Sequence, residues 1–323
     1  MKKLIVFAIT ASCLTALGHA DPLRMFVTDN NGGSVKMYDG VTGAFISNFV
    51  APGSGGLLHP SGIRFGPDGN LYVGSVGTGS VKRYDGTTGA YLGDFATGPG
   101  MENPLEITFG PDGNLYVGTH GSGNQIKRFN GVTGAFMGDF LTGTAMSSPY
   151  QILFHNDGLA YVSMYASGSI DRFNATTGAF VDVFATGLSN PTGIIFSSDG
   201  GLLVSSANGH VVKFAGGTGA LIGNFITQDG TNVMSNPGDL HFGPNNDLFV
   251  THGVTDTVKR FSSTATNTFL GDFFPSGSGG IDYQADFIFN QDFGPGPCPV
   301  PEPSTIVPLL LGGVLLTRRL RRK

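Results

Sequence analysis

One repeated stretch limits what this chain can fold into. Its clearest copy runs from Pro60 to Phe95, and a second copy starts at Pro104 with the same order of apolar residues, glycines and turn dipeptides. Because units of this length bury their faces only against one another, the repeat predicts one domain rather than two. Alignment on T-G-A-[F/Y/L] finds five copies 41 to 46 residues apart, at Gly43, Gly89, Gly134, Gly178 and Gly219, and a degenerate sixth copy at 266–270.

Each repeat contains four short apolar or alternating segments separated by Gly-rich turns. They read P-x-x-I-x-F, L-Y-V-G, S-V-K-R-[Y/F] and A-[F/Y]-L-G-D-F, the lengths and residue types of β-strands. The composition agrees, because the 323 residues include 52 Gly and 26 Phe but no Trp. Four strands per repeat form the unit of a propeller blade, so we predict an all-β fold, a six-bladed β-propeller of four-stranded blades.

The N-terminal end of the domain lacks one strand, and the C-terminal end has one additional strand. Residues 23–27 align with the second strand of a blade, so the first blade lacks its first strand. Residues 285–290 align with a first strand and are followed only by a linker. We therefore predict that this C-terminal strand joins the N-terminal blade and closes the ring, since closure removes open sheet edges. The predicted propeller domain covers 21–293, with blades at 23–50 plus 284–293, 60–96, 104–141, 149–186, 191–226 and 237–274.

In motif, these repeats resemble the NHL family and related six-bladed propellers. The resemblance rests on P-x-G-[IL]-x-F-x-x-D-G-x-L-Y-V followed by V-x-R-[FY], and it covers nearly the whole domain. It implies the propeller fold but leaves the function open, because such propellers include scaffolds, ligand binders, lactonases and lyases.

Both ends of the chain carry the pattern of a transport signal. Residues 1–20 combine a basic start, an apolar run and G-H-A before Asp21, as in a secretory signal peptide. A Pro/Gly linker is predicted at 294–299. The tail that follows, 300–323, has three parts: V-P-E-P-S-T, the apolar run 306–316 and five basic residues.

This tail closely resembles the PEP-CTERM sorting signal through its order, its spacing and its motif Pro301-Glu302-Pro303. In that family the motif, a short membrane helix and a basic cluster direct the protein to an exosortase, which removes the tail during export. Eleven apolar residues span roughly 16 Å as a helix, about half of a bilayer core, which suits a transient anchor. The alternative, an ordinary single-pass tail anchor, leaves the Pro-Glu-Pro motif unexplained.

Charge and cysteine content narrow the classes of partner. Residues 21–299 hold 11 Lys+Arg and 22 Asp+Glu, a net charge of 11 − 22 = −11, which argues against nucleic acid as a partner. Cys13 lies in the predicted signal peptide, so Cys298 alone remains in the mature chain. Neither a disulfide framework nor a Cys-based metal site is expected.

The candidate ligand site is a column of positions two residues after the Pro that opens each first strand. Three carboxylates and an amide are predicted to converge there at one mouth of the channel, on the face where propeller ligands commonly bind. Such oxygen ligands suit Ca²⁺ or another divalent cation, and a resemblance to propeller lactonases implies a metal in a comparable place. The other interpretation is a polar, water-filled channel mouth. The column contains Gly62, Glu106, Gln151, Gly193, Asp239 and Asp286.

His120 and His252 are secondary candidates, because each follows a second strand and so belongs to the same face. A lyase similar to the streptogramin lyases would place His and Glu there with Mg²⁺. That family usually has seven blades, however, and this chain supplies six. The alternative is that both are surface loop histidines. No G-x-S-x-G, P-loop, H-E-x-x-H or usable Cys nucleophile occurs, so no catalytic residue is assigned.

Two further sets of charged residues recur in the repeat, and both are expected to stabilise the fold instead of binding a ligand. The aspartates of the first hairpin turn, such as Asp68, are predicted to be turn residues rather than calcium ligands. The third-strand cations are expected to face fourth-strand aspartates across the hairpin as a ladder. The cations are Arg83, Arg128, Arg172, Lys213 and Arg260, and the aspartates are Asp94, Asp139 and Asp272.

Two functions fit these observations. The first is an exported propeller of the cell surface or extracellular matrix of a Gram-negative bacterium, a non-catalytic binding or scaffold module for a surface protein or an exopolysaccharide. An exosortase would process it, and it would contact the membrane only through its tail before cleavage. The second is a metal-dependent hydrolase or lyase, similar to the lactonases, with its site at the channel mouth. The PEP-CTERM resemblance implies the surface setting.

Overall fold

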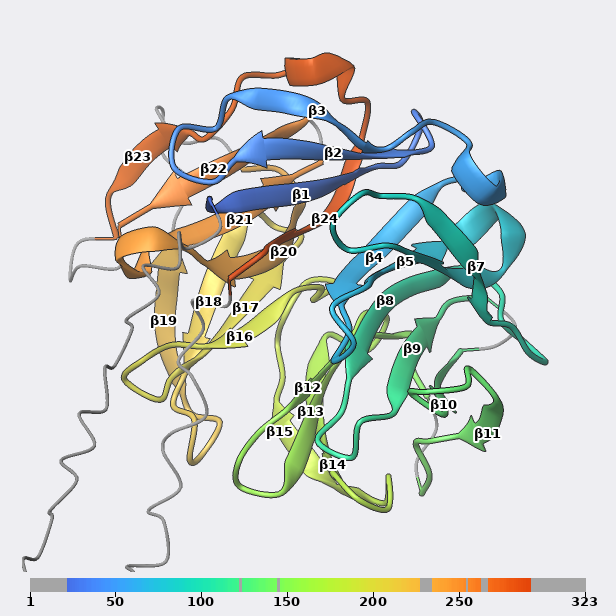
Figure 1. Ribbon diagram of the computed structural model, residues 1–323. Helices are drawn as coiled ribbons and strands as arrows, with labels where there is room; N and C mark the ends of the chain where they lie inside the picture. Colours follow the sequence, from blue (N-terminus) through green and yellow to red (C-terminus); the bar gives the residue numbers. More distant parts are fainter. Residues whose placement is uncertain are drawn as a thin grey trace, which may run out of the picture.

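A computed structural model describes residues 22–121, 124–143, 146–226, 234–253, 255–262 and 267–291. The predicted signal peptide, the linker and the tail with Pro301, Glu302 and Pro303 lie outside these residues. None of the helices in the described ranges is long and apolar enough to cross a membrane. The described chain forms six sheets of four antiparallel strands arranged in a ring (Figure 1). The predicted six-bladed β-propeller is thus confirmed.

Blades are numbered here from the N-terminus, and the strands of each are given from the channel outward. Blade 1 contains β24 (Gln284–Phe289), β1 (Arg24–Asp29), β2 (Ser34–Asp39) and β3 (Phe45–Val50). Blade 2 contains β4 (Pro60–Phe65), β5 (Leu71–Ser75), β6 (Ser80–Tyr84) and β7 (Tyr91–Ala96). Blade 3 contains β8 (Pro104–Phe109), β9 (Leu115–Thr119), β10 (Gln125–Phe129) and β11 (Phe136–Asp139).

The second half of the ring repeats this order. Blade 4 contains β12 (Pro149–Phe154), β13 (Leu159–Met164), β14 (Ser169–Asn174) and β15 (Phe180–Ala185). Blade 5 contains β16 (Ile194–Phe196), β17 (Leu202–Ser206), β18 (His210–Phe214) and β19 (Leu221–Ile226). Blade 6 contains β20 (Pro237–Phe242), β21 (Leu248–His252), β22 (Thr257–Phe261) and β23 (Phe269–Asp272). Short 3-10 turns lie at η1 (Ser54–Gly56), η2 (Val76–Thr78), η3 (Pro244–Asn246) and η4 (Ser278–Gly280).

The last strand closes the ring as predicted. β24 pairs antiparallel with β1, with Met25 opposite Phe289 and Val27 opposite Phe287 (red and blue in Figure 1). Phe287 is fully buried and Phe289 is 4% exposed. The first and last parts of the propeller therefore share one sheet and one core, so the ring depends on both.

In every blade except blade 5, an aromatic residue on the second strand packs against the next blade. Tyr72 of β5 meets Phe109 at the end of β8 edge to face, with 5.0 Å between ring centroids. Tyr116 meets Phe154 in the same way at 4.8 Å. These contacts explain why the repeat pairs L-Y-V with a first strand that ends in Phe, because offset aromatic pairs add to the free energy of simple burial. Corresponding pairs are Phe26 with Phe65, Tyr161 with Phe196, and Phe249 with Phe289.

The predicted role of the turn aspartates is confirmed. Asp68 accepts hydrogen bonds from the backbone N–H of Asn70 and from the Tyr72 hydroxyl. Gly69 beside it has a φ of 77°, the left-handed region that glycine adopts without strain. The first hairpin turn is therefore locally specified, and its carboxylate also anchors the aromatic ring of the following strand.

The prediction of which third-strand cations pair with the fourth-strand aspartates was wrong. Asp94 stands opposite Lys82 in the strand register and is bonded to its Nζ at 2.7 Å, whereas Arg83 stands opposite Gly93. Side chains alternate faces along a strand, so Arg83 points to the other face and stacks on Phe95. Asp139 and Asp272 pair with lysines in the same way, Lys127 and Lys259.

Deleting residues 281–293 should open the ring. The deletion removes β24 and the buried Phe287 and Phe289, and loss of a buried Phe side chain alone costs about 3 to 5 kcal/mol. We expect a sharp fall in melting temperature, since a typical domain has only about 5 to 15 kcal/mol of stability. Deleting 294–299 instead, which leaves β24 intact, is the control. An unchanged melting curve of the first variant would refute closure by this strand.

Candidate functional site

Glycines in the predicted column let neighbouring inner strands approach each other. A Cβ on Gly62 would lie 2.8 Å from the Cα of Glu106, and one on Gly193 would lie 2.9 Å from the Cα of Asp239. Neither position could carry a side chain without moving the adjacent backbone. Blades 2 and 5 therefore contribute no side chain to the column, and the polar side chains of the next blades occupy the channel.

A bulge at the same level turns the column residues toward the channel. The register between first and second strands shifts there in blades 1, 2, 3, 4 and 6. The freed backbone N–H of Asp286 donates to Thr28 Oγ1 at 2.9 Å, and that of Asp239 donates to Thr251 Oγ1 at 2.7 Å. Hydroxyls on the second strands thus replace the missing ladder bonds, as buried backbone groups require.

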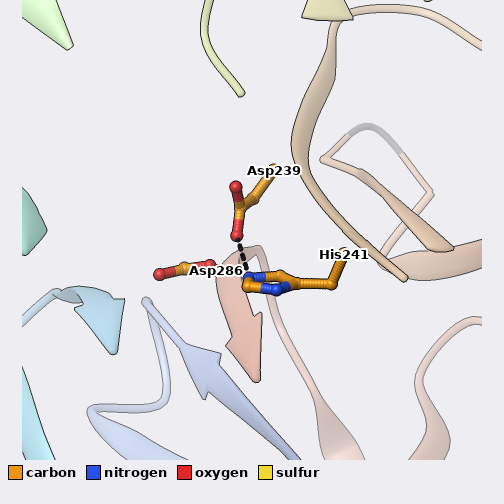
Figure 2. A group of neighbouring side chains, drawn as sticks. All are labelled: Asp239, His241 and Asp286. Atoms are coloured by element: carbon orange, nitrogen blue, oxygen red, sulfur yellow. Dashed lines mark ion pairs between the residues drawn. The ribbon is translucent and has the colours of Figure 1, made fainter. Parts of the chain in front are cut away.

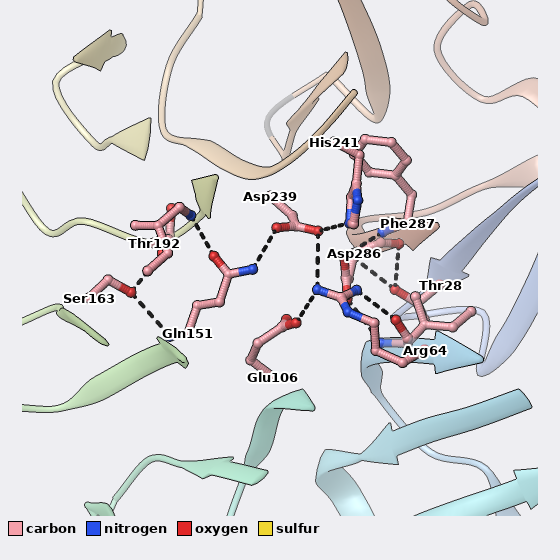
Figure 3. A network of polar contacts seen from close by, with 12 residues as sticks. Thr28, Arg64, Glu106, Gln151, Ser163, Thr192, Asp239, His241, Asp286 and Phe287 are labelled. Carbon is pink, nitrogen blue, oxygen red and sulfur yellow. Dashed lines mark hydrogen bonds and ion pairs between the residues drawn. The ribbon is translucent and has the colours of Figure 1, made fainter. Parts of the chain in front are cut away.

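The structure brings the four predicted side chains together near the channel axis (Figure 3). Gln151 Nε2 lies 3.4 Å from Asp239 Oδ1, and Gln151 Oε1 accepts a hydrogen bond from the backbone N–H of Ile194. Glu106, Asp239 and Asp286 all have side chains at most 7% exposed. The column is therefore a buried network rather than an open, solvated mouth.

Arg64, which was not predicted from the sequence as a site residue, lies in the middle of these carboxylates (Figure 3). Its guanidinium contacts Glu106 Oε1 at 2.6 Å and Asp286 Oδ2 at 3.1 Å, and it lies 4.0 Å from Asp239 Oδ2. It also donates to the carbonyl of Ile63. A single cation from blade 2 therefore links carboxylates from blades 1, 3 and 6.

His241 was also missed, although the pattern contained a signal for both residues. Side chains two positions apart on a strand share a face, so the column has a second level two residues further along. That level contains Arg64, Thr108, Leu153, Ile195, His241 and Ile288. Its two basic members are Arg64, two residues after Gly62, and His241, two residues after Asp239. Both therefore lie next to the carboxyl groups of the first level.

The second level also changes which residues could hold a metal. The ligand atoms of Asp239, His241 and Asp286 all lie within 4.8 Å of one another, with His241 Nε2 2.9 Å from Asp239 Oδ2 (Figure 2). Glu106 instead bonds Arg64, and Gln151 uses its amide on Ile194 and Asp239. The arrangement thus favours a different set from the Glu106, Gln151, Asp239 and Asp286 ring predicted from sequence.

Burial dominates the electrostatics of this cluster. It raises the pKa of Glu106 well above its usual range, and it does the same for Asp286, where the charge of Asp239 adds to the effect. Burial also raises the pKa of Asp239. For Arg64, burial lowers the pKa, but the carboxylates of Glu106, Asp286 and Asp239 outweigh it and raise the pKa overall. Each carboxyl group thus favours a proton or a cation as partner.

A cavity of about 390 Å³ adjoins the cluster, at the end of the channel opposite to the predicted mouth. It lies where the first strands end, because its walls include the last residues of β4, β8 and β20 together with Arg64 and His241. The prediction of a ligand site at the Pro-led end stays a prediction. Arg64 and His241, two of the polar residues that line this cavity, belong to the second level of the column, which lies two residues nearer to this end.

The secondary candidates have different surroundings. His252 is 2% exposed, so its interpretation as a surface loop residue was wrong. Its Nε2 accepts a hydrogen bond from the backbone N–H of Ser235, and its Nδ1 bonds Thr255, which makes it a loop anchor. His120 is partly exposed, and its ring lies 6.1 Å from that of Tyr165, which stacks in turn on Tyr150. Neither histidine belongs to the Arg64 cluster described above.

Comparison with known proteins supports the architecture. No protein-family model matches the sequence, and no curated protein matches it. Among solved structures, a chain of the nidogen/laminin complex has a TM-score of 0.65 at 13% identity, covering 83% of this chain and 98% of that one. A protein of unknown function from Bacteroides caccae has a TM-score of 0.62 at 14% identity, with the same coverage. Virginiamycin B lyase from Staphylococcus aureus has a TM-score of 0.56 at 17% identity, covering 79% and 82%. At these identities the likeness shows the fold alone.

Replacing Arg64 with Met should destabilise the propeller strongly. The variant keeps the length of the side chain but leaves three buried carboxyl groups without their cation, which costs about 3 to 5 kcal/mol for a buried pair. Arg172→Met is the matched control, because Arg172 pairs with Asp182, whose side chain is 45% exposed. That substitution should cost only about 0 to 1 kcal/mol. Equal losses of unfolding free energy in urea would contradict a central role for Arg64.

The cluster should make the metal-free protein less stable as pH rises. A carboxyl whose pKa is raised by folding holds a proton that the unfolded chain releases, so its contribution is complete below the unfolded pKa, about 4, and is lost as pH rises through the folded pKa. Asp199, whose pKa its hydrogen bonds from Lys213 and Ser197 lower to about 2, titrates below this window. Urea unfolding from about pH 5 upward should show a falling free energy, with a smaller slope in Glu106→Gln. Burial lowers the pKa of His252, so this residue acts in the opposite direction in the same range. Equal slopes in the unchanged protein and in Glu106→Gln would therefore contradict the assignment.

Proposed function

We propose that this protein is an exported β-propeller of the cell surface or extracellular matrix that binds a protein or a polysaccharide without catalysing a reaction. The observation that carries the proposal is the position of Arg64. It contacts Glu106 and Asp286, two of the three carboxylates that the sequence predicts as ligand groups. These groups therefore serve first to join the inner strands of different blades.

The export part of the proposal rests on the two ends of the chain. Residues 1–20 have the pattern of a signal peptide, and 300–323 resemble an exosortase-processed tail. The propeller itself fits a binding role, because its loops vary around a closed and rigid ring. One structure with this architecture is a nidogen/laminin complex, in which proteins bind each other. Exopolysaccharide or a surface protein of the same bacterium is the proposed partner.

A second candidate function is a metal-dependent hydrolase or lyase. The cavity of about 390 Å³ favours it, because the cavity has the size of a small-molecule site and is lined by Arg64 and His241. Virginiamycin B lyase is among the proteins with a similar fold. In this alternative the carboxylates would have to leave Arg64 to take part in the reaction.

The two functions differ in their dependence on Glu106. We expect the mature protein, purified from the cells that make it, to lack residues 1–20 and the tail by mass spectrometry. Glu106→Gln should bind the bacterium's exopolysaccharide or surface proteins as the unchanged protein does, because the binding loops lie outside the cluster. Turnover of lactone or cyclic peptide ester substrates that disappears in Glu106→Gln would overturn the binding role in favour of the enzyme. A chain that retains its tail would overturn exosortase processing.

A further inference from the structure

The charges at the centre of the channel are unequal. Three carboxyl groups, Glu106, Asp239 and Asp286, surround one guanidinium, Arg64, so the ionised cluster has a formal charge of −3 + 1 = −2 when His241 is neutral. Burying uncompensated charge is costly, because the interior cannot solvate it as water does. Either protons or a further cation must therefore balance the cluster.

Asp239 is the member that Arg64 neutralises least. Glu106 and Asp286 lie 2.6 and 3.1 Å from the guanidinium, whereas Asp239 Oδ2 lies 4.0 Å away. This oxygen is fully buried, and no described residue donates an aligned hydrogen bond to it. A buried carboxylate oxygen in this condition has a lone pair available for another partner.

The groups nearest to that oxygen are those of a metal site. His241 Nε2 lies 2.9 Å from it, and a carboxylate oxygen of Asp286 lies within 4.8 Å of both atoms (Figure 2). Ligand atoms bound at about 2.1 Å from one ion lie about 3 to 4 Å apart, so small rotations of these side chains are sufficient. The adjoining cavity is lined by His241 and leaves room for water on the remaining positions of the ion.

We propose that Asp239, His241 and Asp286 form a site for one divalent metal ion, beside Arg64 and at the floor of the cavity. The ion compensates the excess charge of the cluster. One imidazole nitrogen and two carboxylates suit Zn²⁺, Mn²⁺ or Fe²⁺ better than Ca²⁺, which prefers six or more oxygen ligands. The net charge of −11 on residues 21–299 raises the local concentration of cations around the domain. The site requires neither catalysis nor a particular partner.

Metal titration of the purified protein tests the proposal directly. The full chain, prepared without a polyhistidine tag and freed of metal by chelator and dialysis, is titrated by calorimetry with Zn²⁺, Mn²⁺ and Ca²⁺ in turn. We expect one ion per chain, with Zn²⁺ or Mn²⁺ bound more tightly than Ca²⁺. No stoichiometric binding would show that protons balance the cluster and would overturn the proposal. Preference for Ca²⁺ would overturn the ligand set.

Substitutions of the proposed ligand residues test where the metal ion binds. Asp239→Asn and His241→Gln keep the shape of each side chain and should weaken binding by roughly 100-fold or more, since loss of outer-shell partners alone typically costs 10-fold to 100-fold. His155→Gln is the matched control, because His155 also contacts an aspartate, Asp157 at 3.2 Å, but outside the channel. Unchanged affinity in both channel variants would place the ion elsewhere.

Arg64→Met adds a readout that loss of folding cannot mimic. Removing the positive charge 4.0 Å from Asp239 should strengthen metal binding, because the guanidinium repels the ion. Each variant is first checked for a cooperative melt. If Arg64→Met does not fold, Asp239→Asn decides the proposal. That variant removes an uncompensated buried charge, so it should be at least as stable as the unchanged protein without metal.

Discussion

The pairing of β24 with β1 closes the ring and also positions one residue of the channel network. It completes the sheet of blade 1 by joining two segments from opposite ends of the chain, with Phe287 and Phe289 buried in the shared core. The same strand carries Asp286, whose carboxylate accepts bonds from Arg64 and from the backbone N–H of Ile63. The strand that closes the ring therefore also completes the channel network, since it supplies one of the three carboxyl groups.

The channel network fills the centre of the propeller with charged groups. A column of apolar side chains would fill the same space without desolvating any charge, and buried ion pairs often add little to stability over such a core. This chain instead places three carboxyl groups, a guanidinium and an imidazole at two adjacent levels (Figure 3). The excess of acid over base gives the network a capacity for protons or for a metal ion that a neutral core would lack.

The fold alone does not determine the function of this protein. Similar propellers include a chain of the nidogen/laminin complex and a lyase, at identities of 13% and 17%. In this chain Arg64 lies among the carboxylates, which agrees with the structural role proposed for the centre of the channel.

The number of blades, the four strands in each and the closing strand could all be predicted from the amino-acid sequence, because they follow from the alignment of its repeats. The sequence also predicted that Glu106, Gln151, Asp239 and Asp286 share one level, since equivalent positions in a propeller meet at its axis. It did not show that Arg64 and His241 form the next level, because they occupy single blades and break the repeat rather than follow it. It also misplaced Asp94, which pairs with Lys82 rather than Arg83, because the register depends on bulges that leave no mark in composition. Which charges meet became clear only in three dimensions, since it depends on distances across the ring between residues far apart in the chain.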